Sequence, residues 1–166
     1  AGIINGTGKT VVNGFVDNNG NIASAVKVET GSLSTNASKI TGGVENNADG
    51  GLVLTGGDLA SAISGDGTTT ISGTVTNTTN SAIGNAVTVA TTGNLTTAAD
   101  KLGGAVQNGG TVQLDGGTLG QTITGGNISI IDNFKFIVDK LKIIIIETYW
   151  FFPNAIEYMF SSDYSC

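Results

Sequence analysis

Eight carboxylates are spread over the first 126 residues, and carboxylates are the side chains that glycoside hydrolysis needs. A glycosidase uses two of them, one as proton donor and one as nucleophile or base. Here the acids lie in expected turns or on alternate strand faces, without a cluster of basic residues that could bind an anionic sugar. Solubility of the surface therefore explains them better than a catalytic pair. They are Asp17, Glu29, Glu45, Asp49, Asp58, Asp66, Asp100 and Asp115.

Residues 6–10 read Gly-Thr-Gly-Lys-Thr, which is similar to the end of a phosphate-binding P-loop. The full motif also needs a glycine at position 3, where this chain has Ile3, and a buried strand before the loop. The corresponding residues 65–69 of a later repeat contain no lysine. We therefore interpret this segment as a solvent-exposed turn and assign no cofactor to it.

Several common catalytic and metal-binding groups are missing from the composition. The chain has no His, all seven basic residues are lysines, and its one Cys is the last residue. These absences exclude a Ser-His-Asp triad, a His metal site and an intrachain disulfide. The net charge of −6 argues against a nucleic-acid partner. The calcium-binding pattern Gly-Gly-x-Gly-x-Asp is absent as well, so the sequence predicts no catalytic, metal or cofactor site.

The elements that would have to position any site come from an internal repeat. Four times the chain reads apolar-x-Gly-x-Val-x-Asn, with the period of two that is typical of strands. The motif recurs at about 30 residues, and alternate copies also match over a longer period of about 60 residues. The glycines of the four copies are Gly14, Gly42, Gly73 and Gly104.

Repetition of the same residue types in the same order predicts the stacked coils of an all-β solenoid rather than a sandwich. We expect the four motif strands to stack in parallel on one sheet, with each glycine facing the core where a Cβ does not fit. One coil per motif gives four coils, and three coils per longer period gives six. The asparagine that ends each motif either forms a ladder with its copies or only shapes a turn; both fit a solenoid.

These motifs resemble the passenger repeats of bacterial autotransporters and related large surface proteins. The resemblance covers residues 1–126 and rests on Val-x-Asn followed by Gly-x-Leu-x-Thr, and on the segment Leu-Val-Leu-Thr-Gly-Gly-Asp-Leu at residues 52–59. It implies a right-handed parallel β-helix that is exported by the type V pathway and displayed at the cell surface. The parent protein would carry an outer-membrane translocator, and this chain would be a fragment of its passenger.

The same resemblance implies a non-enzymatic adhesin or antigen, in which the repeats serve as a stalk. Columns of exposed threonines on stacked coils would offer a flat polar face for weak contacts with glycans or host-cell proteins. The alternative from a different functional class is a carbohydrate-active enzyme, a polysaccharide lyase or hydrolase, on the same fold. Product release that depends on one carboxylate would distinguish this enzyme from a binding module.

Residues 127–166 have a different composition, with no Gly and nine of the ten aromatic residues. This tail is a C-terminal cap, an apolar segment for a partner or membrane surface, or a product of translation out of frame from AT-rich codons. We favour the last. No run of 18 uncharged apolar residues occurs, so no membrane span is predicted. The expected division is a solenoid over 1–126 and an unrelated tail over 127–166.

Overall fold

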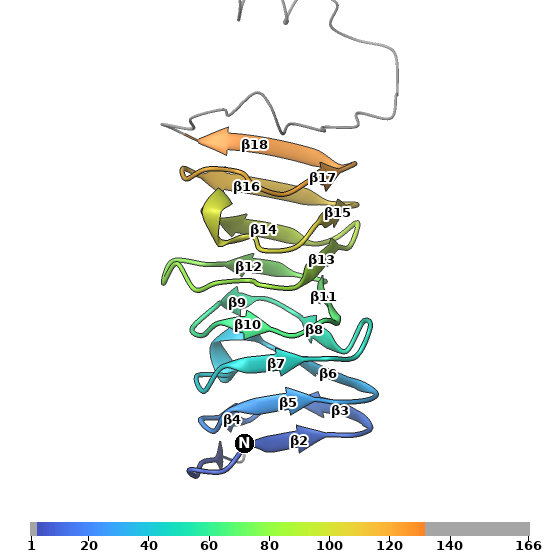
Figure 1. Cartoon of the computed structure of the whole chain (residues 1–166), viewed down its shortest axis with the longest axis vertical. Helices are drawn as coiled ribbons and strands as arrows, with labels where there is room; N and C mark the ends of the chain where they lie inside the picture. The colour runs from blue at the N-terminus through green and yellow to red at the C-terminus, as the bar shows by residue number, and fades with distance from the viewer. Residues whose placement is uncertain (1–2, 132–166) are drawn as a thin grey trace, which may run out of the picture.

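The chain winds into a parallel β-helix of about seven turns (Figure 1), as seen in a computed structural model that describes residues 3–131. Every strand pair of this part is parallel, which confirms the predicted β-solenoid. The described residues contain two short 3-10 helices, η1 (Ala37–Lys39) and η2 (Ala99–Lys101), and no α-helix. Within residues 3–131, no helix is long and apolar enough to cross a membrane.

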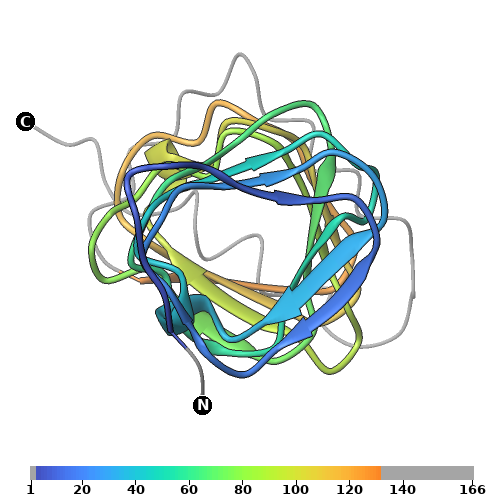
Figure 2. The ribbon, with the colours of Figure 1, turned by 90° about the horizontal axis from the view of Figure 1, so that it is seen from below.

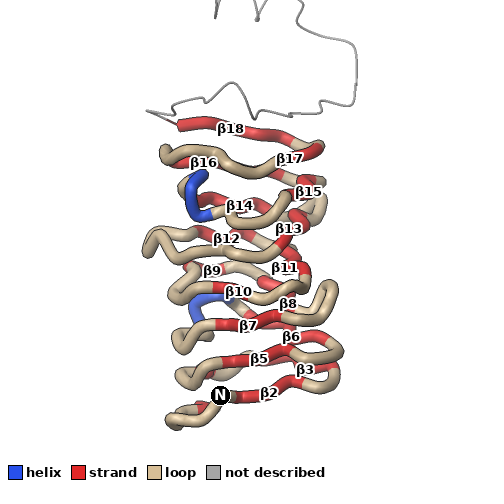
Figure 3. The backbone as a smooth tube through the Cα atoms, viewed as in Figure 1, coloured by secondary structure: helices blue, strands red, loops and turns tan. Residues whose placement is uncertain are grey.

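The strands stack in three main sheets, one on each side of the solenoid (Figure 3). The four-stranded sheet contains β2 (Thr10–Val12), β5 (Val26–Val28), β7 (Val44–Asn46) and β10 (Ile63–Ser64). The seven-stranded sheet contains β3 (Phe15–Asn18), β6 (Ser32–Thr35), β8 (Leu52–Leu54), β11 (Thr68–Ile71), β13 (Ala86–Val89), β15 (Val106–Asn108) and β17 (Ile123–Thr124). The five-stranded sheet contains β9 (Gly57–Asp58), β12 (Thr74–Thr76), β14 (Asn94–Thr97), β16 (Thr111–Asp115) and β18 (Asn127–Ile131). A fourth, two-stranded sheet joins β1 (Ile3–Ile4) and β4 (Asn21–Ile22).

One turn of the solenoid is shorter than the sequence repeat. Thr10 pairs with Val26 in the next turn, and Val75 pairs with Leu95, whereas the motif returns only from Gly73 to Gly104. The predicted count of four coils, one per motif, is therefore wrong; the alternative of three coils per longer period is close to the observed turn length. The motif recurs only after about one and two-thirds turns. The four motif strands consequently do not share a sheet: β3 and β15 lie in the seven-stranded sheet, β7 in the four-stranded sheet and β12 in the five-stranded sheet.

The motif glycine marks a corner and not the middle of a strand. In the third copy, β11 ends at Ile71 and β12 begins at Thr74, with Gly73 between them. A Cβ on Gly73 would collide with the backbone carbonyl of Thr55 in the preceding turn. Gly42 and Gly104 are closed off in the same way by the backbone of the turn before them. Glycine is needed because successive corners approach one another through their backbones, and not because it faces the core.

The asparagine of each motif fixes its corner and reaches the next turn. In Asn46, Oδ1 accepts the Ala48 N–H at 3.3 Å and Nδ2 donates to the Thr68 carbonyl at 3.0 Å. In Asn108, Oδ1 accepts the Gly110 N–H at 3.0 Å and Nδ2 donates to the Asn127 carbonyl at 2.9 Å. Asn18 and Asn77 follow the same plan. The asparagines shape turns and bridge neighbouring coils, but they do not stack as a ladder.

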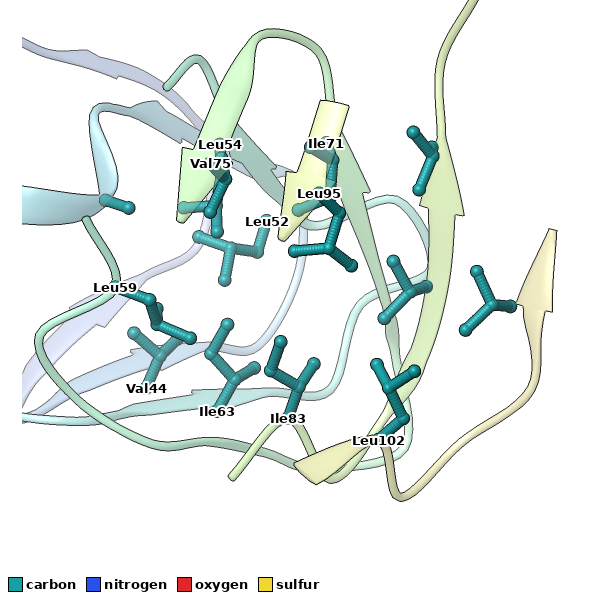
Figure 4. Close-up of a cluster of buried hydrophobic side chains, with 14 of the residues drawn as sticks. Val44, Leu52, Leu54, Leu59, Ile63, Ile71, Val75, Ile83, Leu95 and Leu102 are labelled. Carbon is teal, nitrogen blue, oxygen red and sulfur yellow. The ribbon is translucent and has the colours of Figure 1, made fainter. Parts of the chain in front are cut away.

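The core is a stack of aliphatic side chains that point inward from all three sides. Seen along the axis, the turns lie over one another as a ring that these side chains fill (Figure 2; Figure 4). The apolar members of the core are all Val, Ile, Leu or Ala. Hydrogen-bonded polar side chains are buried as well: Thr69 and Asn85 hydrogen-bond to each other at 3.0–3.2 Å, and buried Thr35 and Thr97 each accept a hydrogen bond from a motif asparagine. These hydrogen bonds give the buried polar groups the partners that they need in the core.

The solenoid continues past the predicted boundary at residue 126. Asn127–Ile131 form β18, whose residues pair with β16 along its whole length. Ile128 pairs with Val112 of the turn before. The strand stacking therefore continues for one more strand after the glycine-rich motif has ended. The remainder of the predicted tail, residues 132–166, lies outside the described residues, and so do the three interpretations of it.

Candidate functional site

Four charged side chains gather on the outer face of the four-stranded sheet. Lys27 in β5 and Glu45 in β7 are direct partners in register, and the alternation of the strands turns both outward. Lys27 Nζ lies 2.5 Å from Glu29 Oε1 and 3.4 Å from Glu45 Oε1. Lys9 Nζ, from the turn before, lies 2.7 Å from Glu45 Oε2. The charges of three successive turns therefore form one alternating network.

This network shifts the pKa values of Glu45 and Lys27. Hydrogen bonds from Lys9 and from Asn47 lower the pKa of Glu45 to about 2, and the carboxylates of Glu29 and Glu45 raise the pKa of Lys27. Glu29 and Glu45 are brought together by Lys27, yet Glu45 is a carboxylate at neutral pH. A glycosidase proton donor needs a raised pKa. The arrangement suits a stabilising surface network better than an acid–base pair.

The other acids with resolved partners serve local structure. The Thr78 hydroxyl, the Thr78 N–H at 3.0 Å and the Thr76 hydroxyl at 3.2 Å all donate to Asp58 and lower its pKa. Asp100 pairs with Lys101 at 2.8 Å. Asp115 accepts the Gln113 amide at 3.1 Å. The remaining acids, Asp17, Asp49 and Asp66, are exposed.

The segment that is similar to a P-loop forms an exposed turn before β2. Gly6 and Gly8 have open space around their α-carbons. Lys9, the residue that would bind a phosphate in a P-loop, is instead directed to Glu45. The Lys9 ammonium is therefore paired with a carboxylate of β7 and does not lie over its own turn.

The outer faces of the other two main sheets carry columns of short, mostly uncharged side chains. In the seven-stranded sheet, register places one outward residue of each turn above the next. This column is Asp17, Ser34, Val53, Thr70, Thr88, Gln107 and Thr124. In the five-stranded sheet the corresponding column is Asp58, Thr76, Thr96, Gln113 and Ser129. Each column begins with one aspartate, Asp17 or Asp58, and its other members are uncharged. We call these two columns the neutral columns.

The neutral columns can form many weak hydrogen bonds at a regular spacing. Adjacent members are separated by the strand spacing of about 4.8 Å. Most of their side chains are half-buried by their neighbours, so little side-chain entropy is lost on contact. Hydroxyl and amide groups donate as well as accept, which suits a neutral polar ligand better than a charged one.

Sequence reasoning expected threonine columns but could not say which residues form them, because that choice depends on the length of a turn. The charge network was missed for the same reason, although Lys9, Lys27 and Glu45 are evenly spaced along the chain.

Within residues 3–131, no group of three acidic or cysteine side chains is close enough to hold a metal ion. Comparison of the chain with protein-family models, with curated proteins and with solved structures yields no match.

Proposed function

We propose that this chain is a non-enzymatic structural and adhesive module, part of a stalk that is displayed at a cell surface. The parallel solenoid of about seven turns supports the proposal, because it builds an elongated body from one repeated layer. The resemblance of its motifs to autotransporter passengers supports the same setting. The parent protein would then be held by an outer-membrane translocator.

The observation that carries the proposal is the pair of neutral columns. They lie on two sides of the same solenoid, while the third side carries the network of Lys9, Lys27, Glu29 and Glu45. An extended partner that runs along the axis meets one hydroxyl or amide at almost every turn. Each contact is weak, but several contacts of one polymer add up to useful binding. Neutral glycans and host-cell surface proteins are the partners that this chemistry fits.

The experiment compares two variants of the full chain for adherence to host cells and to immobilised neutral glycans. Thr70→Lys combined with Thr88→Lys places two charges in the column of the seven-stranded sheet, where the residues are direct partners. Ser64→Lys places one charge on the exposed end of the four-stranded sheet, as a control for added positive charge outside the columns. We expect adherence to fall for the first variant and to persist for the control. Equal adherence of both variants would reject the neutral columns as the contact surface.

The same preparations test the enzymatic alternative. Incubation with neutral and anionic polysaccharides is followed by analysis of released sugars. The proposal expects adherence without product. Turnover that one carboxylate substitution abolishes, for example Glu45→Gln or Asp58→Asn, would replace the adhesive proposal with a carbohydrate-active enzyme.

A further inference from the structure

Four Asn-Gly pairs occur in the chain, and the structure places them in two different environments. They are Asn5-Gly6, Asn13-Gly14, Asn19-Gly20 and Asn108-Gly109. Asn-Gly is the dipeptide in which a backbone nitrogen most easily reaches the side-chain amide before it, since glycine has no side chain to obstruct the approach. Whether the reaction occurs in a folded chain depends on the freedom of these two groups.

Two of the pairs are held by hydrogen bonds. The Gly20 N–H donates to Asn18 Oδ1 at 3.2 Å, and Asn18 Nδ2 donates back to the Gly20 carbonyl at 2.8 Å. The Gly109 N–H donates to the Val89 carbonyl at 2.7 Å. The amide of Asn108 is also engaged at both its oxygen and its nitrogen, as described above, and the residue is 5% exposed. Neither glycine nitrogen is free to act as a nucleophile.

The pair Asn13-Gly14 is open. Both residues are exposed, and a Cβ built on Gly14 would meet no atom within 4 Å. Among the described residues, the Asn13 backbone carbonyl accepts the Thr30 hydroxyl at 3.2 Å, but neither the Asn13 side-chain amide nor the Gly14 N–H makes a hydrogen bond. Gly6 lies in similarly open space beside Asn5. The side-chain carbonyl carbon of Asn13 can therefore rotate toward the Gly14 nitrogen without breaking a native contact.

We propose that Asn13 is a site of spontaneous deamidation in the folded protein, with Asn5 as a second site, and that Asn19 and Asn108 are protected. The Gly14 nitrogen loses its proton and forms a bond to Cγ of Asn13, while the Cγ–NH2 bond breaks and ammonia leaves. Water then opens the resulting succinimide at either carbonyl, which leaves aspartate or isoaspartate. The net reaction consumes one water for each ammonia released, and solvent supplies that water.

The isoaspartate product changes the fit of the first turn on the second. Val12 accepts the Glu29 N–H at 3.0 Å, and Gly14 accepts the Ser32 N–H at 3.1 Å. Isoaspartate at position 13 adds one carbon to the backbone between these two acceptors. Both cannot then keep their present partners, so the first turn loosens at this corner while the later turns keep their register.

The test is peptide mapping by mass spectrometry after incubation of the full chain at mildly alkaline pH in ¹⁸O-labelled water. Asn13 and Asn19 lie in the same tryptic peptide, residues 10–27, so tandem fragmentation compares them within one molecule. We expect label at Asn13 and Asn5 and none at Asn19 or Asn108. In urea, where the hydrogen bonds are lost, all four asparagines should react.

Gly14→Ala is the matched variant, because the open space around Gly14 admits a methyl group and its φ is not positive. The added methyl obstructs the nitrogen, so deamidation at Asn13 should slow severalfold while Asn5 reacts at its former rate. The proposal is overturned if Asn13 reacts no faster than Asn108 in the native chain. It is also overturned if the alanine variant, folded by circular dichroism, deamidates at Asn13 as fast as the original chain.

Discussion

Asn77 donates its side-chain amide to the hydroxyl of Thr97, one turn further along the solenoid, with an N–O distance of 2.9 Å. The same nitrogen donates to the Ser81 carbonyl at 2.8 Å, and Asn77 Oδ1 accepts the Ser81 N–H at 2.9 Å. Asn77 and Thr97 are 5% and 1% exposed. A single buried side chain therefore closes its own corner and fastens that corner to the next turn.

Substitution of Asn77 by alanine tests this double role. Asn77→Ala leaves the Thr97 hydroxyl without its donor and the backbone of Ser81 without its two partners, so we expect the free energy of unfolding to fall by about 1–3 kcal/mol. Urea titration followed by circular dichroism measures the loss. Asn13→Ala is the control, because Asn13 is exposed, and it should stay within about 0.5 kcal/mol of the original chain. Equal stability of the two variants would contradict the bridging role.

Glycines of the same motif should differ in their tolerance of a side chain. Gly73→Val pushes a branched side chain against the Thr55 carbonyl, and overpacking of this kind costs about 1–3 kcal/mol. Gly14→Val, at the corresponding position of the first copy, meets open space and should be nearly neutral. Thermal melting of both variants gives the comparison. A melting transition that Gly73→Val leaves unmoved would show that the corners are not in backbone contact.

The charge network predicts a loss of stability in acid. Because the folded-state pKa of Glu45 is lowered from 4.5 to about 2, the stabilisation is present above about pH 4.5 and is lost as the pH falls toward 2. Glu45→Gln should flatten this part of the stability–pH curve, measured by urea unfolding at several pH values. Asp66→Asn serves as the control, since this exposed carboxylate lies outside the network. The same acid dependence in Glu45→Gln as in the original chain would place the titrating group elsewhere.

Two truncated chains distinguish the contribution of β18 to stability from that of the residues that follow it. A chain that ends at residue 126 lacks β18 and uncovers Val112 and Leu114, which are now 0% and 1% exposed, so its melting temperature should drop. A chain that ends at residue 131 keeps this strand, and we expect it to be at least as soluble and as stable as the full chain. Melting curves and sedimentation of all three chains decide the matter. A large drop for the chain ending at 131 would show that residues beyond β18 stabilise the solenoid.

The stacking of parallel turns could be predicted from the sequence, but the length of a turn stayed open between one coil per motif and three coils per longer period. The four motif corners share one plan: an asparagine bridges to the next coil, and in three of them the glycine lies against the backbone of the turn before, at Gly42, Gly73 and Gly104. The motif therefore looks the same on any side of the solenoid, and its spacing does not reveal how many corners lie between two copies. The length of a turn becomes visible only in the pairing of neighbouring strands, for example where Val87 of β13 pairs with Val106 of β15.

The candidate surfaces were harder to predict than the fold for the same physical reason. Lys9 and Glu45 are 36 residues apart in the sequence. They meet because this separation equals two turns, which places both residues on the same side of the solenoid. Thr70 and Thr88 become neighbours through the register of β11 and β13. In a chain this rich in threonine and glycine, composition gives no reason to select these residues. Their partners follow from the turn length, which the repeat conceals.

The mismatch between repeat and turn has a consequence for how such a chain can change its length during evolution. Val16 and Val106 hold the same motif position and lie in the same sheet, three motif intervals and five turns apart. The two motif copies between them lie in the other two main sheets. Duplication or loss of one motif unit would rotate all later strands by about two-thirds of a turn around the solenoid axis. Each neutral column would then stop at that point and continue on a different side of the solenoid. Gain or loss of one complete turn would keep every downstream side in phase. Recombination that preserves a surface in this protein must therefore proceed in steps of the coil, although the DNA repeat is longer.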